Sequence, residues 1–126
     1  MDHKTLLTLA EEAREKAYAP YSGFSVGAAL LCEDGEVFTG CNIENASFTP
    51  TCCAERVAIF SAVKEGKRRF SAIAVVGNEN PCYPCGVCRQ VLSEFCDGEL
   101  PVLLKNEEGS PVTLTLNDLL PHRFRL

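Results

Sequence analysis

The sequence has no apolar run that approaches the ~20 residues needed to span a membrane. Its N-terminal segment is acidic and has no long apolar stretch, so it does not resemble a signal peptide. No internal repeat or linker interrupts the 126 residues, and 46% of them are apolar, which excludes a disordered tail. We therefore expect a single domain spanning residues 1–126, located in the cytoplasm and without a membrane partner.

The chain also lacks an excess of positive charge. Its 12 Lys and Arg residues stand against 17 Asp and Glu residues, which gives a formal net charge of −5. Nucleic-acid binding depends largely on Lys and Arg that neutralise phosphates, so we expect no nucleic-acid partner. The only basic run, residues 67–69, is expected in the solvated turn after a helix, where cations suit the negative end of the helix dipole. A small neutral substrate is compatible with this charge.

Cysteine, in contrast, is abundant, with eight residues in the chain. Without an export signal, clustered cysteines indicate a metal or catalytic site more often than a disulfide framework. Cys32, Cys41 and Cys96 lie in apolar strand-like or helical stretches and are expected to be small buried hydrophobic residues. The other five cysteines lie between residues 52 and 88.

The spacing of apolar residues predicts alternating helices and strands. Helices are predicted at residues 4–18, 53–65 and 86–95, and strands at residues 25–33, 36–43, 71–77, 101–105 and 111–116. Asp34-Gly35 is a two-residue hairpin signal between the first two strands. A sheet covered by helices, in a three-layer α/β domain, accounts for this order most economically.

Two segments with chemically active residues lie at predicted helix starts: Cys53-Ala54-Glu55 and Pro84-Cys85-Gly86-Val87-Cys88. The positive end of a helix dipole favours the thiolate, which is the form that binds metal. Cys85 and Cys88 are about one helical turn apart, so both can bind one ion, and Cys53 supplies a third ligand. Three protein ligands and an open fourth position are typical of a catalytic zinc site, with one Zn²⁺ per chain.

Glu55 lies two residues after Cys53, in the first turn of the same predicted helix. There it can reach the open side of the metal, take a proton from water and return it to the substrate. Arg56 can offset the negative charge of three thiolates, although a plain surface role is also open for it.

The paired motifs Cys-Ala-Glu and Pro-Cys-x-x-Cys match the zinc nucleobase-deaminase signature. Over nearly its whole length the chain resembles the small, homotetrameric cytidine deaminases, of the cytidine and deoxycytidylate deaminase superfamily. The segments that carry this resemblance are residues 21–30, 40–46, 53–56, 84–90 and 119–121. The resemblance implies a three-layer α/β/α sandwich with a mixed five-stranded sheet.

The resemblance also implies an activity, which is hydrolytic deamination of cytidine and deoxycytidine to uridine and deoxyuridine. Ammonia is released, and the reaction serves pyrimidine salvage. By the same resemblance, Cys53, Cys85 and Cys88 hold zinc. Glu55 moves protons to N3 of the base and then to the leaving amine.

The substrate-binding residues implied by the resemblance are Phe24, Asn42, Glu44, Ala54 and Phe124, and Arg56 and Gln90 support the site from around it. Asn42 and Glu44 are two apart in a predicted strand, so they face the same side. On sequence alone, Phe24 is more often a core residue and Asn42 an ordinary turn residue. Phe124 is expected to cover the base bound to a neighbouring subunit of a homotetramer.

Three segments depart from the family pattern. Phe48 stands where many relatives have Tyr, residues 49–52 are an unusual approach to Cys53, and the loop at residues 78–83 differs. Residues 77–80, Gly-Asn-Glu-Asn, are similar to the deaminases of nucleoside antibiotics. The preference among cytidine, deoxycytidine and modified nucleosides is therefore open.

Three other functions fit parts of the pattern. An iron–sulfur carrier would need a cysteine at position 92, where the chain has Leu92. A structural zinc module would close the site with Cys52 or Cys82 as a fourth ligand. A polynucleotide-editing deaminase shares the chemistry but is disfavoured by the acidic charge.

Overall fold

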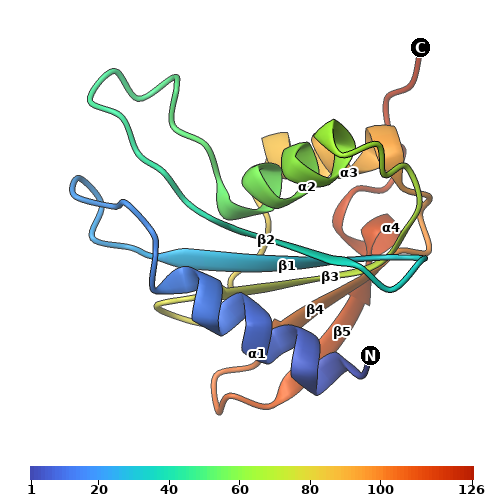
Figure 1. Ribbon diagram of the computed structural model, residues 1–126, viewed down its shortest axis with the longest axis horizontal. Coiled ribbons are helices and arrows are strands. Elements are labelled where there is room, and N and C mark those ends of the chain that lie inside the picture. The colour runs from blue at the N-terminus through green and yellow to red at the C-terminus, as the bar shows by residue number, and fades with distance from the viewer.

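A single five-stranded sheet organises residues 1–126 in this computed structural model (Figure 1). The elements are α1 (His3–Arg14), β1 (Val26–Cys32), β2 (Val37–Cys41), α2 (Ala54–Lys64), β3 (Phe70–Gly77), α3 (Gly86–Phe95), β4 (Pro101–Lys105), β5 (Pro111–Thr115) and α4 (Leu116–Leu119). The strand order is β2-β1-β3-β4-β5. Only β3 and β4 pair in parallel, so the mixed five-stranded sheet is confirmed.

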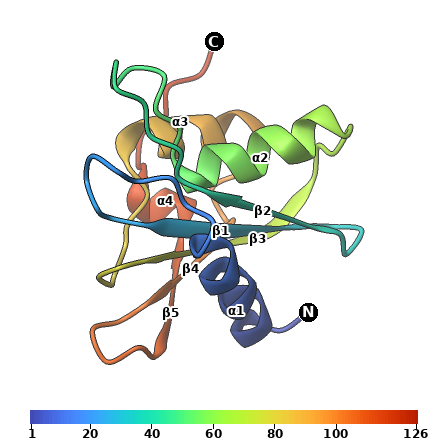
Figure 2. The same ribbon diagram turned by 60° about the vertical axis from the view of Figure 1, so that its left-hand side comes forward.

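The helices cover the sheet on both faces. Helix α1 packs on one face, and α2 and α3 pack on the other (Figures 1 and 2). These three layers confirm the predicted α/β/α sandwich. None of the helices has the length and apolar character that crossing a membrane requires. A single domain over residues 1–126 stays a prediction, which the one continuous sheet supports.

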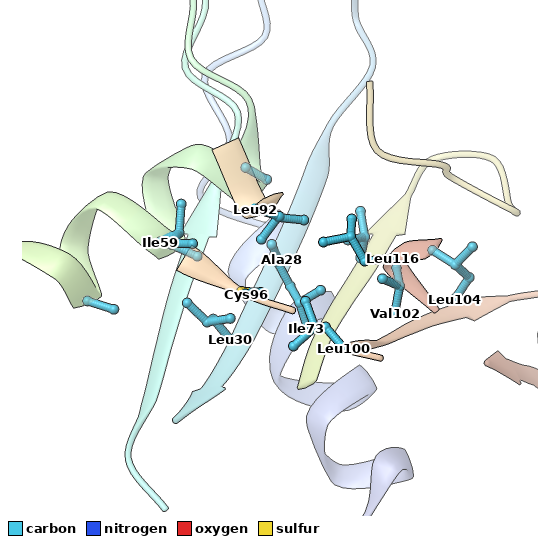
Figure 3. Packing of buried hydrophobic residues seen from close by; sticks show 14 residues of the cluster. Ala28, Leu30, Ile59, Ile73, Leu92, Cys96, Leu100, Val102, Leu104 and Leu116 are labelled. Atoms are coloured by element: carbon cyan, nitrogen blue, oxygen red, sulfur yellow. The ribbon is translucent and has the colours of Figure 1, made fainter. Parts of the chain in front are cut away.

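The core has two halves because successive residues of a strand point to opposite faces. In β1, Ala28 and Leu30 pack toward α2 and α3, whereas Ala29 packs toward α1. Figure 3 shows the larger half, in which Ile59 of α2 and Leu92 of α3 meet the sheet. Strand β3 is buried on both faces from residue 72 onward, as its continuous apolar run predicts.

Four predicted boundaries were wrong, each because of a longer-range contact or a turn. The first helix ends at Arg14 rather than at residue 18, because Tyr18 pairs with Ile43 and donates to the carbonyl of Asn42. The same pairing ends β2 at Cys41 instead of residue 43. The hairpin turn has three residues, 33–35, and ends in Gly35 at φ 95°. The last strand ends one residue before Leu116, which starts α4 under the cap of Thr115.

Candidate active site

The two helix starts meet at one place beside the sheet. Cys53 is the N-cap residue of α2, and Cys85 is the N-cap residue of α3. The sulfur of Cys85 lies 3.8 Å from that of Cys53 and 3.4 Å from that of Cys88. All three sulfurs lie within 4.8 Å of one another, so the structure brings together the three cysteines that the sequence selected.

This spacing fits zinc. Two sulfurs bound to Zn²⁺ at about 2.3 Å in a tetrahedral arrangement lie ~3.8 Å apart. The observed separations are close to that value, so a small movement would bring all three thiols onto one ion. Cys52 and Cys82 are not part of the group, which leaves a fourth position open rather than closed by a protein ligand.

Electrostatics favours the thiolate at Cys53. A hydrogen bond from the Cys88 thiol, followed by the contact with Arg56, lowers the pKa of Cys53 to about 5. The Arg56 guanidinium donates to the Cys53 sulfur at 3.3 Å. The same contact with Cys53, together with burial, raises the pKa of Cys88. Without a metal the pair therefore shares one proton, and a bound cation would displace it.

Glu55 lies in the first turn of α2 and is only 4% exposed. Burial raises the pKa of this carboxyl to about 7, and the negative charge of Cys53 adds to the effect. A carboxyl with a pKa near neutrality can both accept and donate a proton, which is what a general acid–base catalyst needs. This value describes the protein without a metal.

A cavity of about 320 Å³ opens beside the thiols and Glu55. Its size is at the lower end of the range of small-molecule sites. It is lined by residues of four segments that are far apart in the sequence: Ser22, Phe24, Val26, Asn42, Glu44, Thr51, Cys53, Ala54, Glu55, Cys82, Tyr83 and Cys85. Four of the five predicted substrate-binding residues are in this lining.

The polar groups of Asn42 are already partly engaged. Its side-chain oxygen accepts from the Val26 N–H at 2.8 Å, and its amide nitrogen donates to the Phe24 carbonyl at 2.8 Å. One N–H remains for a ligand.

Glu44 is engaged in the same way. One of its oxygens accepts from the N–H groups of Tyr21 and Ser22, and the other accepts from the Ser22 hydroxyl. The Ser22 hydroxyl is the main cause that lowers the pKa of Glu44. The carboxylate keeps acceptor capacity for one further hydroxyl.

Two predicted site residues lie elsewhere. Phe124 is 67% exposed and is not among the residues that line the cavity of its own chain. Gln90 donates to the carbonyl of Phe124 at 3.4 Å, so its printed partner is the C-terminal segment and not a thiol. Both residues border a separate small cavity over α3.

Sequence reasoning missed four lining residues: Ser22, Val26, Thr51 and Tyr83. Tyr83 directly precedes Pro84 and Cys85, and Thr51 lies two residues before Cys53, so both were close to recognised motifs. Cys82 was considered only as a fourth ligand. The structure places it in the cavity wall, where burial raises the pKa of its thiol to about 11.

Comparison with known proteins identifies the family. Residues 1–104 match the family model described as the cytidine and deoxycytidylate deaminase zinc-binding region. The chain belongs to this deaminase family. The matched region contains all three clustered thiols, so zinc is the metal that this group fits.

Relatives and solved structures agree. The deaminase is 53% identical to a cytidine deaminase of Sporosarcina psychrophila, over 98% of this chain and 92% of the relative. It is 51% identical to the cytidine deaminase of Halalkalibacterium halodurans, over 98% of this chain and 95% of the relative. A crystal structure of the Burkholderia pseudomallei cytidine deaminase matches with a TM-score of 0.94 and 53% identity, over 98% and 100% of the two chains. The chain is thus an enzyme of the deaminase type, a class of hydrolases that act on C–N bonds.

Proposed function

We propose that this deaminase converts cytidine and deoxycytidine to uridine and deoxyuridine with release of ammonia. The observation that carries the proposal is the buried Glu55 beside three clustered thiols, at the end of a cavity of nucleoside size. The names of the close relatives support it. The family resemblance further places the reaction in pyrimidine salvage in the cytoplasm.

In this proposal Cys53, Cys85 and Cys88 hold one zinc ion, which lowers the pKa of water and so supplies a nucleophile at neutral pH. Glu55 takes the proton of that water and delivers it to N3 of the base. It then carries a proton to the amino group that leaves from C4. Its raised pKa suits this shuttle, because the carboxyl has to exist in both protonation states.

Phe24, Asn42, Glu44 and Ala54 bind the substrate in this proposal. The remaining N–H of Asn42 and the remaining acceptor site of Glu44 are assigned to a hydroxyl of the sugar. Phe24 and the buried Ala54 line the cavity where the base would lie. Arg56 holds Cys53 and offsets the charge of the thiolates.

We further propose that the active unit is a homotetramer in which Phe124 covers a neighbouring site. The exposed ring of Phe124, its absence from the cavity of its own chain, and its anchoring by Gln90 support this arrangement. Sedimentation of the purified protein and kinetics after removal of residues 122–126 test it. A fully active monomer, or a truncated form with unchanged kinetics, would contradict it.

Ammonia release from a panel of nucleosides tests the proposed activity. The panel contains cytidine, deoxycytidine, free cytosine, adenosine and a cytosine-containing nucleoside antibiotic. We expect turnover of cytidine and deoxycytidine, with zinc bound and with formation of uridine and deoxyuridine. Turnover of the antibiotic alone would show that the loop at residues 78–83 has redirected the site.

A further inference from the structure

Asn78, in the turn after β3, holds the two peptide groups that flank Phe24. Its amide nitrogen donates to the carbonyl of Gly23 at 2.8 Å. Its side-chain oxygen accepts from the N–H of Ser25 at 3.2 Å and from the hydroxyl of the same residue. One side chain thus fixes the chain both before and after Phe24.

Asn42 holds the next groups along the same segment, the carbonyl of Phe24 and the N–H of Val26. The N–H of Phe24 is bound by the hydroxyl of Ser22 at 3.0 Å. Every main-chain polar group from the carbonyl of Gly23 to the N–H of Val26, apart from the carbonyl of Ser25, therefore has a side-chain partner. The Ser25 carbonyl accepts from the N–H of Asn78, so it too is tied to this turn.

Arg14 holds Asn78 in turn. Its guanidinium donates to the side-chain oxygen of Asn78 at 2.6 Å and to the hydroxyl of Ser25 at 2.7 Å. A salt bridge to Glu11 at 2.8 Å fixes the same guanidinium on α1. Asn78 itself is exposed, so this bond to a charged donor is what orders its side chain in solvent.

The ring of Phe24 has little freedom. It lines the cavity and packs over Gly77, where a Cβ atom would lie 3.0 Å from the ring. Cys82 contacts Gly77 from the same side, at 2.9 Å from that Cβ position. A shift of the Phe24 main chain would therefore move the ring within the cavity.

We propose that Asn78, oriented by Arg14, is a positioning residue that sets the place of Phe24 and thereby the affinity for the base. This inference rests on the proposed function, in which Phe24 contacts the base. Phe24 would contact the ring equally before and during the reaction, so loss of its position weakens binding and leaves the chemical step in place. Asn78 lies in the loop that departs from the family pattern, which makes it a point at which substrate choice can vary.

The test compares Asn78→Ala with the parent enzyme on cytidine. We expect the KM to rise roughly 3- to 10-fold, because hydrogen bonds of modest net strength are lost, while kcat and zinc content are retained. Asn78→Asp keeps the acceptor for Ser25 and Arg14, so its KM should stay closer to the parent value. Asn106→Ala is the matched control: this Asn accepts from the N–H groups of Glu108 and Ser110 in a distant turn, and its loss should leave KM unchanged.

A double-mutant cycle shows whether Asn78 acts through Phe24. In a Phe24→Ala background, Asn78→Ala should change KM by no more than about twofold. Arg14→Gln provides a second variant with the same expected pattern, should Asn78→Ala fold poorly. An unchanged KM in an active Asn78→Ala enzyme, or a full effect in the Phe24→Ala background, overturns the inference. A parent enzyme that does not act on cytidine overturns the proposed function instead.

Discussion

A Cβ atom on Gly40 would lie 2.3 Å from the main-chain oxygen of Ala54. Gly40 is buried in β2, and Ala54 is the first residue of α2, directly between Cys53 and Glu55. The obstacle is main chain, so no side-chain rotation could relieve it. The absence of a side chain at Gly40 therefore sets how closely the start of α2, with its thiol and carboxyl, rests on the sheet.

Gly40→Ala should displace α2 and impair the site. We expect a loss of about 1–3 kcal/mol of unfolding free energy from overpacking, and a fall in turnover per folded molecule. Leu6→Ala is the control, because Leu6 is buried under α1 on the other face of the sheet. It should cost about 2–5 kcal/mol yet keep its turnover when folded. Equal turnover in the two folded variants would contradict this account; urea unfolding and steady-state kinetics measure both quantities.

Removal of single thiols should separate the metal ligands from their neighbours. Cys85→Ala and Cys88→Ala should each lose the bound zinc and the activity, since two thiols are too few to hold the ion. Cys82→Ala should keep about one zinc per chain, because its sulfur is outside the cluster. Metal analysis of the purified variants checks this. Zinc retained in Cys88→Ala with full turnover would mean that the ligand set is wrong.

Deamination should depend on the sugar. Glu44 keeps an acceptor site after binding Tyr21 and Ser22, and a lost hydrogen bond to a charged group costs roughly 10- to 100-fold in kcat/KM. Accordingly, 2′,3′-dideoxycytidine should react at least tenfold less efficiently than cytidine, by about that estimate, and free cytosine less still. Changing the substrate avoids Glu44→Ala, which would also release the segment at residues 21–22. Equal efficiency on all three compounds would remove Asn42 and Glu44 from the sugar site.

The predictable part of this protein was local. The buried run of β3, the helix starts at Cys53 and Cys85, and the spacing of Cys85 and Cys88 could all be predicted from neighbouring residues. These features suffice to predict a metal site once two helix starts are assumed to meet.

The unpredicted part depends on contacts between distant segments. Pairing of Tyr18 with Ile43 shortened α1 against its own helical pattern. The bonds from Asn78 to residues 23 and 25, like the bond from Gln90 to Phe124, join segments that no sequence spacing relates. The side chains that complete the cavity were missed for the same reason.

The hairpin between β1 and β2 should contribute a pH-dependent term to stability. Lys67 lies 2.7 Å from Asp34 and 2.9 Å from Glu36, and its hydrogen bond lowers the pKa of Asp34 below 3.8. The folded state thus favours ionised Asp34, so this stabilisation is present above pH 3.8 and is lost as the pH falls through the lower folded pKa.

Lys67→Met should therefore lower the urea midpoint at neutral pH, and its difference from the parent should narrow in acid. Lys64→Met is the control, since Lys64 is highly exposed and only 3.8 Å from Glu65. A difference between Lys67→Met and the parent that stays constant down to strongly acid pH would exclude this ion pair as its cause.

The most direct test of the account is the Glu55→Gln enzyme, measured for zinc content and cytidine turnover in the same preparation. Glu55 is buried beside the thiols without belonging to their cluster, and glutamine has nearly the same shape but cannot carry the proton. We expect zinc at the parent level together with a loss of about 10²–10⁴-fold in kcat, the usual contribution of general acid–base catalysis. Turnover within a few-fold of the parent enzyme, with zinc still bound, would contradict the proton-shuttle role on which the proposed function depends.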